Sequence, residues 1–329
     1  MPDCDPKIVI LDGYTTNPGD LDFSRLAGLG DLTVYDRTDD RDVLDRIGDA
    51  QIVLTNKTLL NARTLREAPQ LEYVGVLATG YNVIDIDAAA EEGVTVTNVP
   101  GYSTDSVAQH VFALLLELCN RTAEHDAAVH DGQWVTSEDF SFTTGPLVEL
   151  AGKKLGIVGV GDIGRRVATI GHALGMKVLA AHQSSMNEVN LPGIDIEWMP
   201  HDDLFARADV VTLHCPLTPE TEGMVSQERL ASMKETAFLI NTGRGPLVDQ
   251  QALADALIGS SLAGAGLDVL SNEPPEPANP LLSAPRCVIT PHIAWATAEA
   301  RQRLIDIASD NVAAFLNDEP TNVIAGPRK

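Results

Sequence analysis

Hydrophobic positions in the first hundred residues form short apolar runs that alternate with amphipathic segments. Each run is nearly continuous and rich in β-branched residues, a pattern typical of parallel strands covered on both faces. The segments between the runs have helical spacing, and several end in Gly or Pro, as helices do. We expect strands at 7–13, 32–37, 51–57, 73–80 and 94–100, and helices at 20–30, 42–50, 61–69 and 85–93.

A second alternating series begins at Lys154, after a long helical stretch over roughly 103–131. The tail 297–317 has the spacing of one amphipathic helix. The segment SNEPPEPANPLL, at 271–282, is Pro-rich but lies between two strands, so we expect an ordered loop rather than a linker. The expected strands of this series lie at 154–161, 176–182, 196–200, 208–215, 236–243, 264–270 and 287–294.

Two βαβ arrays joined by a long helix predict an α/β protein with two doubly wound parallel sheets and a cleft between them. The length of 329 residues suits two domains. The first would comprise 1–102 plus 296–329, with the final helix returning to the first array. The second would comprise 103–295.

Charge and cysteine content narrow the classes of partner and compartment. With 47 acidic and 23 basic residues, the formal charge is −24, which disfavours nucleic acid and anionic membrane surfaces. Two explanations of the acidic charge stay open: adaptation to a salt-rich host, and a surface that is simply well solvated. The four cysteines show no CxxC spacing, so we expect no metal site and a reduced, cytoplasmic compartment. The N-terminus resembles a strand rather than a signal peptide.

The sequence GVGDIG follows the apolar run KLGIV and opens an amphipathic helix. In this setting the first Gly allows a tight turn, the second allows close approach of a pyrophosphate, and the third allows close helix–strand packing. The pyrophosphate would lie at the helix N-terminus. A Gly-rich turn that binds nothing is the alternative. The predicted dinucleotide contacts are Gly159, Gly161 and Gly164, which would make 103–295 the dinucleotide-binding domain.

The stretch VLAAHQSS, at 178–185, lacks the carboxylate that normally accepts hydrogen bonds from the adenosine ribose. The expected position falls near His182, followed by Gln183, Ser184 and Ser185. A carboxylate there would repel the extra phosphate of NADP, so its absence removes a barrier to NADPH. We therefore expect NADPH to be accepted, and a preference for NADPH stays open because no Arg or Lys follows closely to make it firm.

Polar residues follow three later apolar runs, at the strand ends where doubly wound sheets bind ligands. Arg244 lies between Gly243 and Gly245 and suits a bidentate grip on a carboxylate, although a surface Arg is the simpler alternative. His292 follows a strand, and a Glu such as Glu273 beside it would stabilise the imidazolium and fix its tautomer. A structural His at a strand end is the alternative for His292.

Taken together, GVGDIG, NTGRG, LDVLSNEP and TPHIAW occur in an order that resembles the D-isomer-specific 2-hydroxyacid dehydrogenases. The resemblance covers nearly the whole chain. The stretches VLATGYNVID and NVPGYSTDSVAQHVFALLL, and more loosely DFSF at 139–142, resemble the glycerate dehydrogenase (hydroxypyruvate reductase) branch.

The resemblance implies a role for each matching residue. Arg244, Glu273 and His292 would be catalytic: Arg244 would bind the substrate carboxylate, His292 would transfer the proton, and Glu273 would support His292. The implied substrate contacts also include Thr79, Gly80, Asn56, Lys57 and Trp295. The implied cofactor contacts, besides the three glycines of the loop, Arg244 and His292, are Thr104, Val107, Asp162, Ile163, His182, Gln183, Ser184, His214, Cys215, Pro216, Thr242, Gly243 and Asp268.

The resemblance also implies an NAD(P)H-dependent enzyme that interconverts a small 2-keto acid and a D-2-hydroxy acid, as a homodimer with a contact through the long helix. Glu273 argues against formate as substrate, because formate oxidation needs no proton transfer. An acid-rich first array argues against a phosphorylated substrate. Hydroxypyruvate is expected first and glyoxylate second. A non-enzymatic, corepressor-like NAD(H)-binding protein and a dehydrogenase for another 2-hydroxy acid are the alternatives.

Overall fold

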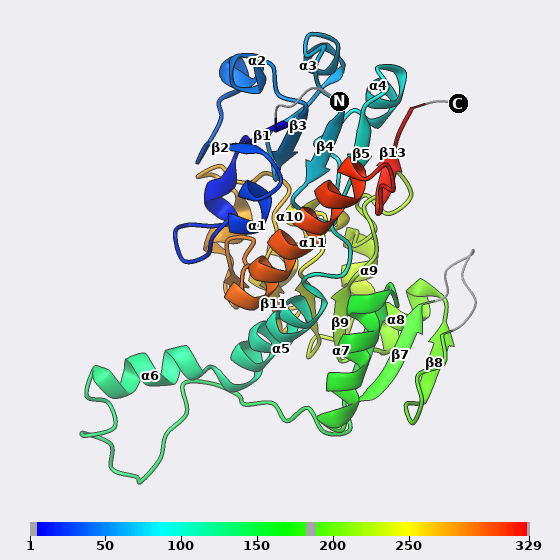
Figure 1. The fold of residues 1–329 in the computed structure, drawn as a ribbon. Coiled ribbons are helices and arrows are strands. Elements are labelled where there is room, and N and C mark those ends of the chain that lie inside the picture. Colours follow the sequence, from blue (N-terminus) through cyan, green and yellow to red (C-terminus); the bar gives the residue numbers. More distant parts are fainter. Residues whose placement is uncertain (1–4, 182–188, 328–329) are drawn as a thin grey trace. The chain divides into compact units, whose positions relative to one another are not determined.

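The computed structural model describes residues 5–181 and 189–327 (Figure 1). The chain forms two compact units. One comprises Met1–Ser103 with Ala296–Lys329, and the other comprises Thr104–Trp295. Each unit contains one predominantly parallel sheet flanked by helices, which confirms the predicted α/β class. No helix within the described ranges is both long and apolar enough to cross a membrane.

The first unit holds a six-stranded sheet in the order β13-β5-β4-β3-β1-β2. All pairs are parallel except β13, which is antiparallel to β5. The strands are β1 (Lys7–Ile10), β2 (Asp31–Val34), β3 (Ile52–Thr55), β4 (Tyr73–Val76), β5 (Thr95–Thr97) and β13 (Val323–Ala325). The strand order reverses between β1 and β3, the switch point where a doubly wound sheet presents its ligand edge.

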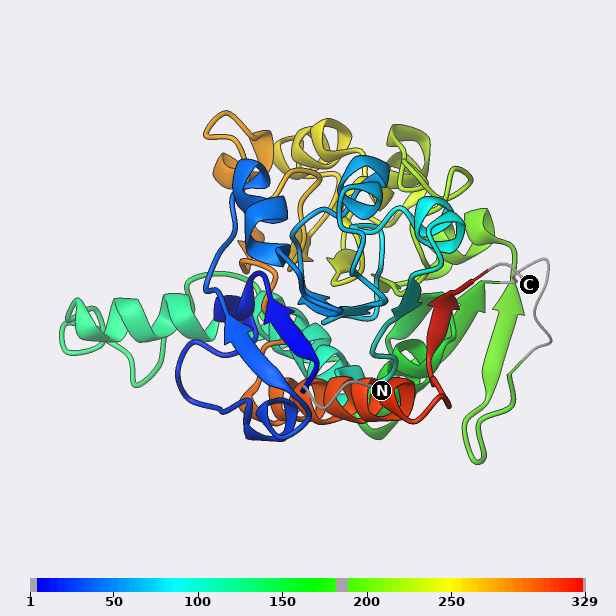
Figure 2. The same ribbon diagram turned by 45° about the horizontal axis from the view of Figure 1, so that its top comes forward.

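Residue alternation in these strands gives the first sheet two buried faces. Val9, Val53, Val74 and Val96 pack with helices on one face. On the other face, the ring of Tyr73 lies 4.8 Å from the ring of Phe315. The first face is covered by α2 (Val43–Ile47), α3 (Ala62–Arg66) and α4 (Ile86–Glu91), and the second by α1 (Ser24–Ala27) and α11 (Ala298–Leu316). Figure 2 shows α11 running along its face of the sheet, as expected from the amphipathic tail.

The strand β13 is not among the elements expected from the sequence. It follows α11 and pairs through Val323 with Thr97 of β5. Three residues are too few to give a clear alternation pattern, so only the pairing reveals the strand. The C-terminal segment thereby becomes an edge of the first sheet.

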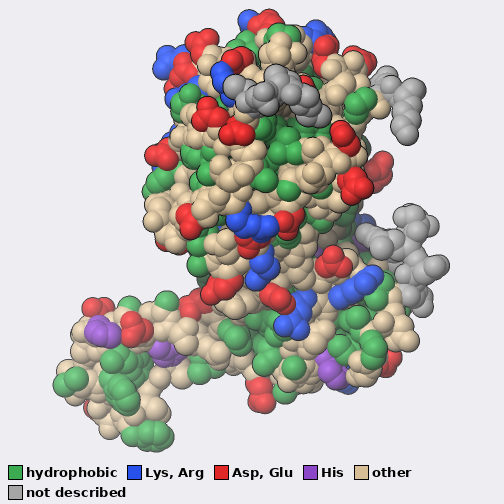
Figure 3. Space-filling view, viewed as in Figure 1, with side chains coloured by type: hydrophobic (Ala, Val, Ile, Leu, Met, Phe, Trp, Pro, Cys, Tyr) green, Lys and Arg blue, Asp and Glu red, His purple; other side chains and the backbone are tan. Residues whose placement is uncertain are grey.

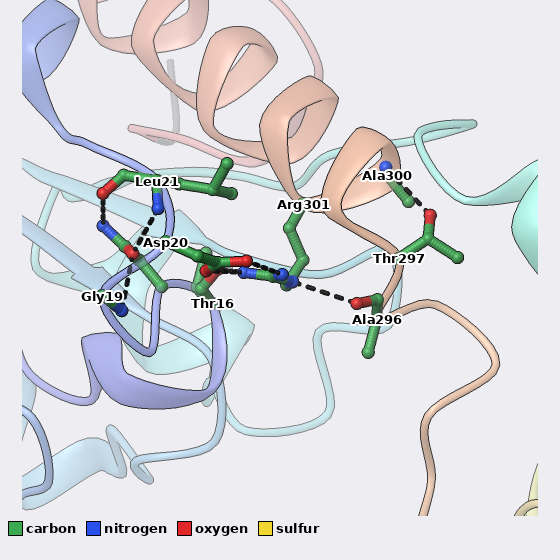
Figure 4. Close-up of polar contacts among 9 residues, drawn as sticks. Thr16, Gly19, Asp20, Leu21, Ala296, Thr297, Ala300 and Arg301 are labelled. Carbon is green, nitrogen blue, oxygen red and sulfur yellow. Dashed lines mark hydrogen bonds and ion pairs between the residues drawn. The ribbon is translucent and has the colours of Figure 1, made fainter.

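An ion pair ties the loop after β1 to the start of α11 (Figure 4). The Arg301 guanidinium donates to both Asp20 oxygens, at 2.7 and 2.6 Å, and its Nε donates to the carbonyl of Ala296 at 3.0 Å. The Thr297 hydroxyl accepts from the Ala300 amide and caps α11. Arg301 is buried whereas the Asp20 side chain is half exposed, so the arginine lies under the loop that it holds.

The second unit holds a seven-stranded parallel sheet in the order β12-β11-β10-β9-β6-β7-β8. Every strand expected from the second series is present. The strands are β6 (Lys154–Val158), β7 (Lys177–Ala181), β8 (Ile196–Met199), β9 (Val210–Leu213), β10 (Phe238–Asn241), β11 (Gly264–Leu267) and β12 (Cys287–Ile289). Here the order reverses between β6 and β9, the arrangement of a dinucleotide-binding sheet.

Helices cover both faces of the second sheet and form two apolar clusters with it. One face packs against α5 (Thr104–Asn120) and α7 (Asp162–Ala173). The other face packs against α8 (His201–Arg207), α9 (Gln227–Ser232) and α10 (Gln250–Ile258). The apolar run VAQHVFALLLELC, at 107–119 in α5, therefore faces the core of the second unit.

The helical stretch expected over 103–131 is two helices rather than one. Arg121 has φ +52°, a left-handed conformation that ends α5, and α6 (Thr122–His130) begins at the next residue. The carboxylate of Glu117 accepts from the Thr122 hydroxyl at 2.6 Å and from the Ala123 amide at 3.3 Å. Glu117 thus accepts from two of the donors at the start of α6, which stabilises the bend between the two helices.

Candidate active site

Five strands of the second sheet end at one edge and carry most of the predicted site residues there. Because these strands are parallel and adjacent, their carboxyl ends share an edge, as the sequence pattern predicted. The residues that follow the strands are Gly159 after β6, His214 after β9, Thr242 after β10, Asp268 after β11 and Thr290 after β12.

The glycine loop after β6 has the geometry of a dinucleotide-binding turn. Gly159 has φ +97°, and a Cβ there would lie 2.6 Å from the backbone of His214 and Cys215. A Cβ at Gly164 would lie 2.1 Å from the Gly159 carbonyl oxygen. A Cβ at Gly161 would instead meet no atom within 4 Å. Two glycines therefore serve packing, and the third leaves the N-terminus of α7 open, which fits a pyrophosphate.

His214 lies beside this loop at the switch point of the sheet. Its amide donates to the Val158 carbonyl at 2.7 Å, and its Nε2 lies 2.9 Å from the Thr212 hydroxyl. Burial lowers the pKa of His214 to about 3, so the imidazole is neutral at physiological pH. Burial also raises the pKa of the neighbouring Cys215 thiol to about 11. Neither side chain brings a charge to this part of the cofactor site.

The turn after β10 presents Arg244. Asn241 braces this turn, since its side chain donates to the Arg244 carbonyl at 2.9 Å and accepts from the Gly243 amide at 3.0 Å. The Arg244 guanidinium donates from Nη1 to the Gly243 carbonyl at 2.8 Å. Over 5–181 and 189–327, no carboxylate forms an ion pair with Arg244. A partly buried guanidinium without a carboxylate partner suits an anionic ligand.

Thr242, in the same turn, has a buried hydroxyl with no hydrogen-bond partner among the described residues. Buried polar atoms are almost always paired, so an unpaired one at a ligand edge fits a bound group. Together with the open N-terminus of α7, this atom shows that the described residues fit the predicted dinucleotide. The predicted contacts His182, Gln183 and Ser184 lie outside the described residues.

Glu273 and His292 form the acid–base pair expected from the sequence. His292 Nδ1 lies 2.5 Å from Glu273 Oε2, and the Leu270 amide donates to Glu273 Oε1 at 3.0 Å. An ionised carboxylate only accepts hydrogen bonds, so Nδ1 carries the proton and Nε2 is left for a ligand. Both side chains are partly exposed, at 25% for His292 and 34% for Glu273, as reaction with a substrate requires.

In the first unit, Asp12 organises the loop after β3. Its carboxylate accepts from the amides of Asn56, Lys57 and Thr58 at 2.7, 2.5 and 2.9 Å. Asn56 is buried, and its side chain donates to the Leu77 carbonyl at 2.5 Å, whereas Lys57 is exposed. Asn56 therefore holds the end of β4, and its predicted contact with substrate stays a prediction, as does that of Lys57.

The turn at Thr79 and Gly80 is held by a chain of asparagines. Asn98 donates to the Thr79 carbonyl at 2.7 Å, and the Thr79 hydroxyl donates to the Val99 carbonyl at 2.9 Å. Asn311 of α11, which is buried, donates to the Asn98 carbonyl at 2.9 Å. The predicted carboxylate-binding turn is thus fixed by the C-terminal helix of the same unit.

Sequence reasoning missed Asp12, Asn98 and His110 as residues that shape the site. Asp12 follows the first apolar run directly, a strand-end position that could have flagged it. His110 lies within the apolar run of α5, so no local pattern marks it as a site residue. Of the other predicted residues, Thr104 begins α5, Val107 is buried, and Trp295 ends the second unit. Their contacts with cofactor or substrate stay predictions.

The described residues contain no cluster of acidic, His and Cys side chains suited to a metal.

The fold and this edge define a dinucleotide-dependent oxidoreductase. A sequence profile of the D-isomer specific 2-hydroxyacid dehydrogenase, NAD binding domain, matches residues 112–294. The chain belongs to this family, as the motifs predicted, and is an NAD(P)-dependent oxidoreductase that interconverts 2-keto and 2-hydroxy acids.

Named relatives match over most of the chain. It is 49% identical to hydroxypyruvate reductase of Blautia hydrogenotrophica, across 97% of this chain and 99% of the relative. It is 40% identical to glycerate dehydrogenase of Methylorubrum extorquens, across 86% of this chain and 88% of the relative. A solved NADPH-dependent glyoxylate/hydroxypyruvate reductase of Sinorhizobium meliloti, in complex with NADP and malonate, superposes with a TM-score of 0.83 at 28% identity, across 99% of each chain.

Proposed function

We propose that this protein reduces hydroxypyruvate to D-glycerate with NAD(P)H, with glyoxylate as its second substrate. The observation that carries this proposal is the 2.5 Å contact between Glu273 and His292, in the same unit as Arg244. Arg244 has no carboxylate partner among the described residues. Relatives that act on hydroxypyruvate, glycerate or glyoxylate, at 49%, 40% and 28% identity, support the choice of substrate.

A bound nicotinamide cofactor would supply the hydride, and this chain's own residues would handle the charge and the proton. Arg244 binds the substrate carboxylate and polarises the carbonyl. Negative charge that develops on the carbonyl oxygen is neutralised by a proton from His292 Nε2. Glu273 holds the opposite ring atom and stabilises the imidazolium before transfer. The amides at Thr79 and Gly80 are predicted to contact the substrate carboxylate.

We further propose that NADPH is accepted as well as NADH. The support is the absence of a carboxylate in VLAAHQSS and the NADP complex of the Sinorhizobium relative. We also propose a reduced, cytoplasmic setting, supported by the free thiols of Cys119, Cys215 and Cys287.

We propose that the protein is a homodimer that associates through α6 and the loop after it. Figures 1 and 3 show this segment extending from α5, with hydrophobic side chains gathered on it. Val135, Phe140 and Trp134 are 89%, 91% and 53% exposed. The loop is nevertheless ordered, because the Trp134 indole donates to the Phe140 carbonyl at 2.9 Å. Exposed apolar side chains on an ordered segment mark an interaction surface.

Light scattering tests the dimer. We expect twice the chain mass of 35.1 kDa for the wild type and one chain mass for V135S/F140S. I258S, which removes an exposed apolar side chain of α10, is the matched control and should stay dimeric. A monomeric wild type would refute the dimer, and a dimeric double variant would refute the contact.

A steady-state panel of hydroxypyruvate, glyoxylate and pyruvate, each with NADH and NADPH, tests the reaction. We expect the highest kcat/KM with hydroxypyruvate and measurable turnover with both cofactors. Higher kcat/KM with pyruvate would overturn the proposed substrate, and a large preference for NADH would overturn the cofactor proposal. H292A should lose turnover while it still quenches or shifts NADH fluorescence on binding. Loss of cofactor binding instead would make His292 a structural residue.

A further inference from the structure

The turn that carries His292 has a backbone conformation that its neighbours must impose. His292 has φ +56°, in the left-handed region. That region costs a residue with a Cβ about 1 kcal/mol or more. The His292 amide donates to the carbonyls of Asp268 at 2.8 Å and Thr290 at 3.0 Å. These backbone bonds fix the start of the turn, but they do not fix its far side.

The buried carboxylate of Asp268 holds both sides of the turn. It accepts from the Thr290 hydroxyl at 2.6 Å, the Ile293 amide at 2.9 Å and the Ala294 amide at 2.8 Å. Burial raises the pKa of Asp268, but hydrogen bonds from His110, Thr290 and the two amides outweigh it and lower the pKa below its ordinary value. The carboxylate is therefore ionised and accepts hydrogen bonds from the Thr290 hydroxyl and the two amides, with His110 Nε2 3.4 Å away.

Counting protons assigns the direction of the next hydrogen bond. The Thr290 hydroxyl has one proton, and the ionised carboxylate of Asp268 can only accept it. The 2.8 Å contact between His110 Nε2 and the Thr290 oxygen is therefore donated by His110. His110 Nε2 also lies 3.4 Å from Asp268 Oδ1. The result is a directed chain from His110 through Thr290 to Asp268, with the proton of His110 on Nε2.

A second residue on the same helix contacts the other end of the turn. Ser106 precedes His110 by four residues, so both lie on one face of α5. The Ser106 hydroxyl donates to the Ala294 carbonyl at 2.5 Å. One face of α5 thus contacts the turn at Thr290 and at Ala294, on either side of His292.

We propose that His110 is a positioning residue for His292. Its donated hydrogen bond keeps the Thr290 hydroxyl directed at Asp268, and Asp268 then holds the turn on both sides of His292. The inference deepens the proposed function, because it rests on His292 being the proton donor. A small displacement of a proton donor lowers the rate of the chemical step more than it lowers ligand binding.

The test compares H110A with H110Q in the full chain. Glutamine retains an N–H donor at a reach similar to that of the imidazole Nε2. With hydroxypyruvate and NADH, we expect H110A to lower kcat about 10- to 100-fold, with KM and the NADH Kd unchanged. We expect H110Q to restore most of kcat. H172A, which removes an exposed histidine of α7, is the control and should leave kcat within about twofold of the wild type.

Threonine variants keep the test decisive if H110A does not fold. T290V removes the hydroxyl with little change of shape, and T290S keeps the hydroxyl. We expect T290V to reproduce the loss of kcat, T290S to spare it, and H110A/T290V to be no worse than T290V alone, because the residues act in one chain. The inference is overturned if H110A or T290V leaves kcat unchanged, if H110Q fails to restore kcat, or if NADH affinity falls together with kcat.

The wild type is measured first. Its failure to reduce any 2-keto acid would refute the proposed function itself, whereas each of the other results concerns His110 alone.

Discussion

Glu273 binds His292 with one carboxylate oxygen and the Leu270 amide with the other, at 2.5 and 3.0 Å. Glutamine offers only one oxygen, so E273Q would turn an amide N–H toward one of these two donors. We expect kcat to fall about 10- to 100-fold, because His292 loses both its orientation and its charge partner. NADH affinity, measured by fluorescence titration, should not change.

A matched substitution separates the role of Glu273 from a general effect of charge. Glu276 lies in the same loop and is exposed. E276Q should therefore behave as the wild type. Equal activity of E273Q and the wild type would show that the pair does not serve the reaction.

Arg244 contributes a planar guanidinium rather than only a positive charge. R244K keeps the charge but loses the two parallel donors that match a carboxylate. We expect kcat/KM for hydroxypyruvate to fall about 100-fold, equivalent to roughly 3 kcal/mol for hydrogen bonds to a charged group. R207K is the control, because exposed Arg207 pairs with Glu197 in β8. Steady-state kinetics of the two variants would contradict this role if both lost activity equally.

Asn311 connects the C-terminal helix to the turn at Thr79 through Asn98. N311A removes the hydrogen bond to the Asn98 carbonyl and the acceptor for the Thr321 hydroxyl. We expect KM for hydroxypyruvate to rise roughly fivefold, the equivalent of about 1 kcal/mol, with little change in kcat.

The dinucleotide loop lies in the other unit, so the NADH Kd of N311A should stay constant. N317A changes an exposed asparagine at the end of the same helix and should leave KM unchanged. A fall in kcat without a rise in KM would argue that the turn does not bind substrate.

Asp268 makes the stability of the protein depend on acid pH. Its pKa is lower in the folded state than its ordinary value, so the carboxylate stabilises the fold above about pH 4 and less as pH falls through the folded-state value. D268N loses the stabilisation that the ionised carboxylate provides. It also places an amide N–H donor opposite the backbone amides of Ile293 and Ala294, which are donors themselves. We expect D268N to be less stable by about 1–3 kcal/mol near neutral pH.

Urea unfolding at successive pH values from 7 to 3 tests the effect of Asp268. The difference in free energy of unfolding between the wild type and D268N should narrow as the pH falls, because protonation of Asp268 removes the extra stability of the wild type. A gap that stays constant across this range would contradict the assignment.

Arg301 stabilises the first unit more than its partner Asp20 does. R301K loses the two parallel bonds to Asp20 and the bond to the Ala296 carbonyl, whereas D20N loses the charge of a half-exposed group and one of the two oxygens that accept from Arg301. We expect R301K to lower the free energy of unfolding by about 1–3 kcal/mol and D20N to lower it by less. Thermal unfolding ranks the two variants, and a larger effect of D20N would contradict the burial argument.

Local patterns determined the class of fold and most of the site. The apolar runs of the two arrays predicted twelve of the strands, because parallel strands buried on both faces need such runs. The glycine loop, Arg244, Glu273 and His292 were found because each follows an apolar run, and parallel strands bring their carboxyl ends to one edge. The sequence also sufficed to predict the Glu273–His292 pair, although 18 residues lie between them.

Tertiary structure alone decided what holds these residues in place. His110 lies in an apolar run, and its hydrogen bond to Thr290 joins residues 180 positions apart. Asn311 and Asn98 are 213 positions apart, and β13 is defined only by its pairing with β5. No local pattern encodes such contacts, because hydrogen bonds between distant segments form only once both sheets have packed their helices. The sequence by itself therefore determined which residues are proposed to do the chemistry, and the packed structure decided which residues form hydrogen bonds around them.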